Sequence, residues 1–309
     1  MKLLMLHGYT QNGDVFQRKL RRLTAKITHA FPGTTFHWPS GPLKLQVDDL
    51  PDLVPRQSTG IDDLDLRAWF DLRDTQDPPK GFLNSLDLLA DVLDMHGPFD
   101  GIVAFSQGAV VAPFIASLLQ GQARYEAFLV AKIVGSNVMA YPKSFKELQH
   151  PRLKFAVLCA GRLVQEKYYD WMYESPRLET PFCLFNGDLD PMVDYGDRAA
   201  VPERLSGRHL AKVVVHPGAH HMPNDERSLA TIVQFMRDHV SAKSDSSDDS
   251  AWEFVGGSPG YGEERWHGRA CRADDKGSQR VEGACPRCFT LYHFPSQCDA
   301  LVGKRVEAL

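Results

Sequence analysis

The sequence has neither a marked excess of one charge nor a long apolar run. Its 35 lysine and arginine residues are balanced by 39 aspartate and glutamate residues, and the formal net charge is −4. Because proteins that bind nucleic acid present a basic patch to the phosphates, we do not expect nucleic acid as a partner. No stretch approaches the roughly 20 apolar residues of a membrane-spanning helix, so we expect no membrane partner either.

The first residues also lack the features of a secretory signal peptide. The apolar run that begins at Leu3 is short, and no small-residue cleavage site follows it. We interpret Lys2–Leu6 as a first β-strand and expect a cytoplasmic protein.

Cysteine is scarce before residue 240. Cys159 and Cys183 lie in apolar, strand-like segments and are predicted to be inert, buried thiols. The stretch at residues 241–249 is rich in Ser and Asp and has almost no core-forming residue, which is typical of a linker. The sequence therefore predicts a folded domain at residues 1–240, followed by a linker and a tail at residues 241–309.

The tail contains the remaining cysteines, with His267 and His293 nearby. These cysteines are candidates for zinc ligands: Cys271, Cys285, Cys288 and Cys298. They include a single Cys-x-x-Cys pair, whereas a structural zinc site usually has two paired ligand sets. Three interpretations stay open: a zinc site, a disordered or weakly ordered tail that binds no metal, and an unrelated extension from a mis-called gene end.

The stretch at residues 100–119 has the pattern of a nucleophile elbow. A short apolar strand runs into Ala104-Phe105-Ser106-Gln107-Gly108, and an apolar helical run follows. A serine in a tight strand-to-helix turn needs small residues two positions before and after it, and here these are Ala104 and Gly108. The pattern predicts that Ser106 is a nucleophile.

The rest of the domain alternates predicted strands and helices, which indicates an α/β fold with a mostly parallel sheet. Helices are expected at about Asp14–Ala30, at Gly81–Met95 with Leu83 inward, and at Asn224–Val240 with Asn224 as N-cap. Further strands are expected at Phe36–Pro39, Leu153–Ala160, Phe182–Phe185 and Lys212–Val215, and no element is assigned within Arg124–Gln149.

Two more loops after predicted strands carry residues that match a catalytic triad. Asp190 lies in a Gly-x-x-Asp-x-x-Val turn, and His220 follows the last predicted strand. The order Ser, Asp, His is that of an α/β-hydrolase, in which the histidine takes the proton of the serine and the aspartate orients the imidazole. Asp188 and His221 are the alternatives to Asp190 and His220.

The loop after the first strand is expected to complete the site. One backbone N–H of an oxyanion hole would come from Tyr9 or Thr10, and the other from Gln107. The irregular stretch Leu43–Pro79 is expected to shape the substrate site through Trp69 and Phe70, although these aromatic residues could equally close the core.

Four strings of this sequence together resemble the FSH family of serine hydrolases. They are residues 6–12, Gly97 to Gly108 with its Gly-Pro-Phe-Asp-Gly lead-in, Gly187 to Val193, and Gly218 to Pro223. The resemblance covers about residues 1–240 and extends to the human ovarian-cancer-associated hydrolase. The chain departs from the family pattern at Ala104 and Ala219, where glycine is usual.

The resemblance implies an α/β-hydrolase fold and a cofactor-independent esterase or thioesterase with Ser106, Asp190 and His220 as the triad. Its implied substrate is a small-molecule or carrier-bound acyl group. Some fungal members release chains from the carrier domain of a polyketide synthase in secondary metabolism, so such a domain is a possible partner. The alternative is a non-catalytic member of the fold that only binds a small molecule.

Overall fold

The structure is a computed structural model that describes residues 1–46, 49, 65–135, 137–164, 167–173, 176–193, 205 and 210–240. The predicted linker and tail at 241–309 lie outside the described residues, and so do their cysteines and histidines. Part of the predicted substrate-shaping stretch, at 47–48 and 50–64, also lies outside them.

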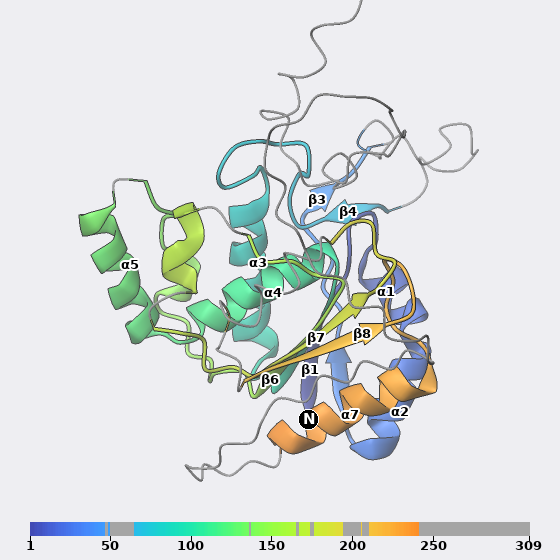
Figure 1. The fold of residues 1–309 in the computed structure, drawn as a ribbon. Coiled ribbons are helices and arrows are strands. Elements are labelled where there is room, and N and C mark those ends of the chain that lie inside the picture. Colours follow the sequence, from blue (N-terminus) through green and yellow to red (C-terminus); the bar gives the residue numbers. More distant parts are fainter. Residues whose placement is uncertain are drawn as a thin grey trace, which may run out of the picture.

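A six-stranded parallel sheet forms the centre of the described structure (Figure 1). Its strand order is β2-β1-β5-β6-β7-β8. The strands are β1 (Lys2–Leu6), β2 (Thr35–His37), β5 (Gly101–Phe105), β6 (Phe155–Cys159), β7 (Phe182–Gly187) and β8 (Ala211–His216). The chain moves outward from β1 to β2 and then returns to the other side of β1 at β5. The loops that leave β1 and β5 therefore diverge at a topological switch point, where open α/β sheets bind their ligands.

The central strands β5, β6 and β7 are buried on both faces, which explains why their sequences are largely apolar. Side chains alternate along each strand. On β1, Leu4 and Leu6 point into one hydrophobic core, called the first core, and Leu3 and Met5 point into a second core on the other face of the sheet. On β5, Ile102 belongs to the first core. All of these side chains are fully buried.

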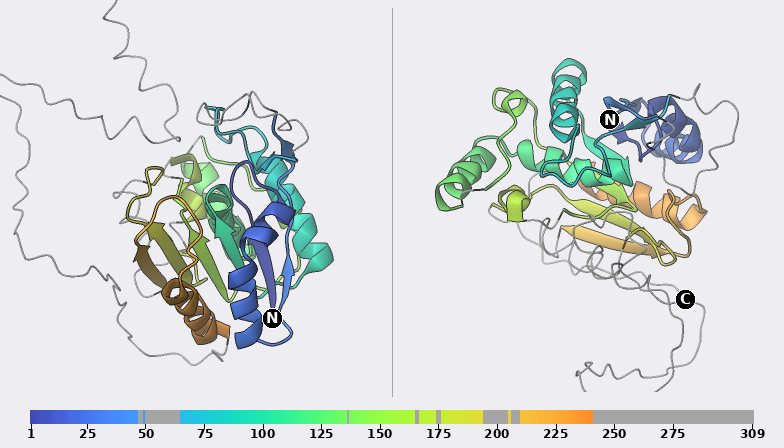
Figure 2. Two further views of the ribbon diagram at one scale, coloured as in Figure 1. Left: turned by 90° about the vertical axis from the view of Figure 1, so that its right-hand side faces the viewer. Right: turned by 90° about the horizontal axis from the view of Figure 1, so that it is seen from above.

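Helices cover the two faces in two groups (Figures 1 and 2). The first core is closed by α3 (Phe82–His96) and α4 (Gln107–Leu118). Outside α4 lie α5 (Gln122–Val134) and the short 3-10 helix η3 (Lys167–Met172), while η2 (Lys143–Phe145) contacts α3. The second core is closed by α1 (Gly13–Lys19), α2 (Arg21–Ala30) and α7 (Glu226–Val240).

A small antiparallel pair lies beside the carboxyl edge of the main sheet. It consists of β3 (Leu43–Lys44) and β4 (Arg67–Ala68), and an isolated bridge joins Gln11 to Arg67. The bridge ties β4 to the loop after β1, and β4 leads directly to Trp69 and Phe70. These two residues of the predicted substrate-shaping segment therefore lie next to the strand ends that carry the site.

The structure corrects three local predictions. The expected helix at Asp14–Ala30 is two helices, because Leu20 leaves the helical range at φ −95° and ψ 14°. Leu83 is exposed, since it falls one position off the buried stripe of α3. The cap of α7 is Asp225 and not Asn224. An N-cap side chain must reach the N–H two or three residues further on, and Asp225 Oδ1 accepts from Ser228 N at 2.9 Å.

Candidate active site

Ser106 lies in a strained turn between β5 and α4. Its backbone has φ 51° and ψ −117°, a left-handed conformation that is rare for a residue with a side chain. The turn leaves no room at Gly108, where an added Cβ would lie 2.5 Å from the carbonyl oxygen of Leu6. Ala104 is fully buried on β5. Packing thus requires a residue without a side chain at position 108.

His220 connects Ser106 to Asp190. Its Nε2 lies 2.8 Å from Ser106 Oγ, and its Nδ1 lies 2.9 Å from Asp190 Oδ2 and 3.1 Å from Oδ1. Because an ionised carboxylate only accepts hydrogen bonds, Nδ1 carries the proton and Nε2 is left to accept from the serine hydroxyl. The Asp190 side chain is 0% exposed and that of His220 is 21% exposed.

The two alternative residues have other partners. Asp188 Oδ1 accepts from the backbone N–H of Gly218 at 2.9 Å and so ties the β7 loop to the β8 loop. His221 is exposed, its Nδ1 lies 3.0 Å from the carbonyl of Met222, and its ring contacts that of His216 at a tilted angle. The structure therefore brings Ser106, Asp190 and His220 together and leaves Asp188 and His221 outside the contact.

The loop after β1 packs directly against the elbow. An added Cβ on Gly8 would lie 3.1 Å from Ser106 Cβ, and Gln11 N donates to Gly8 O across a tight turn at 3.2 Å. Within that turn Thr10 has φ 64°. Tyr9 and Thr10 both line the cleft at Ser106, so both stay candidates for the oxyanion hole together with Gln107.

His7 forms a rigid base for this loop. It is fully buried, its Nδ1 lies 2.8 Å from Gly8 O, and its Nε2 accepts from Gly41 N at 2.9 Å. Burial lowers the pKa of His7 to about 4, so the ring is neutral. Its carbonyl accepts from Gly108 N at 3.1 Å and from Trp69 Nε1 at 2.8 Å.

Trp69 and Phe70 have different roles in the structure. Trp69 is fully buried beside His7. It lines neither the cleft at Ser106 nor the small pocket beside that cleft, so it closes the core. Phe70 lines a small apolar pocket next to the main cleft. Sequence reasoning missed what holds both of them. The carboxamide of Gln107 accepts from Trp69 N at 2.8 Å and donates to Phe70 O at 2.7 Å.

An open cleft of about 500 Å³ exposes the Ser106–His220 pair. Its walls come from the β1 loop, from α1 and α2, and from the loop after β8, where they include Met222 and Pro223. The polar groups of the site thus face a space large enough for an organic substrate.

The described residues contain no group of three or more His, Cys, Asp or Glu side chains arranged to hold a metal ion. Both described cysteines are buried, and burial raises the pKa of Cys183 to about 12 and that of Cys159 well above its ordinary value. They are inert thiols, as predicted. Within the same residues, every helix is too short or too polar to cross a bilayer.

The parallel sheet, the elbow after β5 and the three facing side chains define the α/β-hydrolase class. Residues 1–232 match the family model described as "Serine hydrolase (FSH1)", and the chain belongs to this family. The family predicted from the four strings is thereby confirmed.

Three relatives illustrate the likeness. The chain is 24% identical to "Family of serine hydrolases 2" of Saccharomyces cerevisiae, with 76% of this chain and 97% of that protein covered. It is 25% identical to "Esterase OVCA2" of Danio rerio, with 77% and 96% covered. It is 27% identical to a Schizosaccharomyces pombe protein named "Dihydrofolate reductase", where the match covers 76% of this chain and 47% of that protein. The chain thus spans about half the length of that last relative.

Proposed function

We propose that this protein hydrolyses carboxylic esters or acyl thioesters through an acyl-serine intermediate. The observation that carries the proposal is the continuous contact from Asp190 through His220 to Ser106, at 2.9 Å and 2.8 Å. Membership of the serine hydrolase family supports it.

In the first half-reaction the Ser106 Oγ attacks the carbonyl carbon and its proton passes to His220 Nε2. The tetrahedral intermediate places its oxyanion near the backbone N–H of Gln107 and that of Tyr9 or Thr10. Collapse breaks the bond to the leaving group, which takes the proton from His220 and departs as an alcohol or a thiol. Asp190 stabilises the imidazolium while it exists.

In the second half-reaction water replaces the leaving group. His220 takes a proton from the water, the new hydroxyl forms a bond to the acyl carbon, and the acyl–Ser106 bond breaks. The proton returns to Ser106 Oγ, so one water is consumed and one carboxylic acid is released.

The decisive experiment compares wild type with Ser106→Ala. Both proteins are treated with a fluorophosphonate probe and assayed with p-nitrophenyl esters and with an acyl thioester. We expect labelling and turnover in wild type and neither in the variant. Folded wild-type protein that is not labelled and turns over no substrate would contradict the proposal, and the protein would then be a non-catalytic binding member of the fold.

A second part of the proposal concerns substrates attached to a carrier domain, such as that of a polyketide synthase in secondary metabolism. Four exposed basic residues lie within five positions at the junction of α1 and α2: Arg18, Lys19, Arg21 and Arg22. Lys19 also lines the cleft at Ser106. An acidic carrier domain could dock on these charges while its acyl thioester enters the cleft.

This part is tested with the double variant Arg21→Glu/Arg22→Glu. We expect its kcat/KM on a carrier-bound acyl thioester to fall at least about tenfold, with no comparable loss on the same acyl group attached to free pantetheine. Lys132→Glu on α5, away from the cleft, is the matched control. An equal loss on both substrates, or no loss on either, would refute docking at these residues.

A further inference from the structure

Two cavities of the described structure share one wall residue. The open cleft at Ser106 and a smaller pocket of about 40 Å³ are both lined by Leu72. Leu72 is half-buried and packs against the first core. Most of the residues that line the smaller pocket are apolar or aromatic, and they include Phe70, Leu72, Phe82, Val110, Phe114 and Tyr169. Three charged residues, Asp71, Asp77 and Arg162, also line it.

The smaller pocket begins close to the nucleophile. Val110 lies one helical turn after Ser106 on α4, and its N–H donates to Ser106 O at 3.1 Å. Phe114 lies one further turn along α4 and also lines the pocket, with its ring centroid 4.9 Å from that of Phe82. Ser106 lines the cleft, and Leu72 is common to the cleft and the smaller pocket.

The position of His220 separates the two ends of a substrate. His220 returns its proton to the leaving group, so the leaving group must lie on the histidine side of Ser106. The open cleft contains His220 and the residues that follow it, including Met222 and Pro223. The smaller pocket contains none of them. The leaving group therefore occupies the cleft, and the acyl chain extends away from His220.

We infer that the pocket behind Leu72 binds the acyl chain and limits it to a short apolar group. The inference rests on the proposed hydrolase function. Roughly 10–15 Å³ of such volume accommodates one water-sized group, so the pocket holds about three or four carbon atoms beyond the carbonyl. The structure thus favours butyryl- or pentanoyl-sized groups over acetyl and over long chains.

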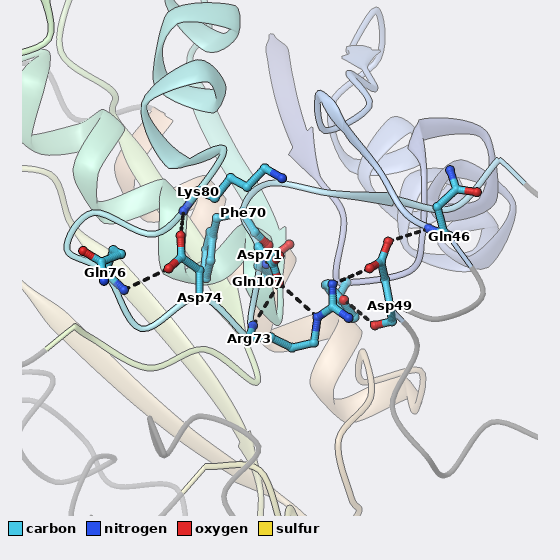
Figure 3. A network of polar contacts seen from close by, with 10 residues as sticks. Gln46, Asp49, Phe70, Asp71, Arg73, Asp74, Gln76, Lys80 and Gln107 are labelled. Atoms are coloured by element: carbon cyan, nitrogen blue, oxygen red, sulfur yellow. Dashed lines mark hydrogen bonds and ion pairs between the residues drawn. The ribbon is translucent and has the colours of Figure 1, made fainter. Parts of the chain in front are cut away.

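The wall at Leu72 is fixed by a polar network in the loop that carries it (Figure 3). Next to Leu72, Asp71 Oδ1 accepts from Arg73 N at 2.9 Å, and Arg73 forms an ion pair with Asp49. Asp74 accepts from the backbone N–H groups of Gln76 and Lys80 at 3.0 Å and 2.6 Å, and these bonds lower the pKa of Asp74. The loop is therefore braced on both sides of Leu72, so this side chain selects by size.

The test measures kcat/KM for p-nitrophenyl esters of acetate, butyrate, octanoate and dodecanoate, so that the leaving group stays constant. Wild type is expected to prefer butyrate, with at least about a tenfold decline to dodecanoate. In Leu72→Ala the octanoate-to-butyrate ratio should rise at least about tenfold, because each newly buried methylene is worth about fourfold. In Val110→Phe, where the larger side chain fills the pocket, the ratio of kcat/KM for butyrate to that for acetate should fall at least about tenfold.

Met222→Ala is the matched control, because Met222 lines only the cleft on the histidine side. Its profile over acyl length should keep the wild-type shape. If Leu72→Ala and Val110→Phe both retain the wild-type profile while all proteins turn over esters, the acyl-pocket inference is wrong and the hydrolase proposal stands. If folded wild type turns over no ester and takes up no fluorophosphonate, the hydrolase proposal itself fails.

Discussion

The side chain of Gln107 holds Trp69 in place, since its Oε1 accepts from the backbone N–H of Trp69 at 2.8 Å. The residue whose own N–H is a candidate oxyanion donor thus also anchors the segment beside the acyl pocket. Its Nε2 completes the link by donating to Phe70 O at 2.7 Å. These two hydrogen bonds therefore join the elbow to the segment that forms the pocket wall.

This connection predicts the effect of Gln107→Leu. The change leaves the backbone groups of Trp69 and Phe70 buried without this partner, at about 1–3 kcal/mol each. We expect a loss of about 2–6 kcal/mol in the free energy of unfolding, measured by urea denaturation. Gln149→Leu is the control, because Gln149 is exposed and its hydrogen bond to Glu147 O is long, at 3.4 Å. Similar losses in both variants would refute the anchoring role.

A second prediction separates the two aspartates after β7. Asp190→Asn should reduce kcat by about 10³–10⁴, because the amide no longer fixes the proton on His220 Nδ1. Asp188→Asn keeps an oxygen that accepts from Gly218 N and should cost less than about tenfold. Steady-state kinetics on one ester decides between them, and a larger loss in the Asp188 variant would reverse the assignment.

A third prediction concerns the space at the elbow. In Gly108→Ala the new Cβ would lie 2.5 Å from Leu6 O and 2.6 Å from His7 O, both of which are backbone atoms that cannot rotate away. We expect a loss of more than about 3 kcal/mol in unfolding free energy. Gly33→Ala has a positive φ of 80° but nothing within 4 Å, and should lose only about 1–2 kcal/mol. Thermal denaturation of both variants tests this ranking.

The neutral, buried His7 predicts a pH-dependent stability. Its pKa is about 4 in the folded protein against 6.5 for an exposed histidine, so the unfolded chain binds more protons between these values. The contribution of neutral His7 to the free energy of unfolding is complete above pH 6.5. It is lost as the pH falls toward 4, and the total loss is on the order of 3 kcal/mol.

Urea denaturation from pH 7 to pH 4 measures this contribution. His7→Gln should be less stable than wild type at pH 7, and its unfolding free energy should fall less steeply with decreasing pH. His29→Gln, at an exposed helix position, should retain the wild-type slope. Parallel slopes for wild type and His7→Gln would show that His7 does not titrate in this window.

The parallel sheet could be predicted from the sequence because its strands are buried on both faces. Residues 101–105, 155–159 and 182–185 are therefore short continuous apolar runs. The same logic predicted which loops would meet at one edge. Helix α5 could not be placed, because it exposes Val130, Ile133 and Val134, which obscures the periodicity of an amphipathic helix.

The walls of the site were less accessible to sequence reasoning than its polar groups. The contact between Gln107 and Phe70 spans 37 residues, and nothing in either segment signals the other. Leu72 also gives no local signal, since its position between two cavities depends on α3, α4 and the loop after β6 packing around it. Such long-range contacts are set by tertiary packing and not by local pattern.

The contact between Ser106 and His220 joins residues 114 positions apart, and it closes only when the outermost strand, β8, is in the sheet. A chain in which β8 has not yet paired with β7 would therefore carry Ser106 without its histidine partner. Covalent labelling of Ser106 would then report on completion of the fold. In a refolding experiment, the rate at which reactivity returns would time the docking of the last strand.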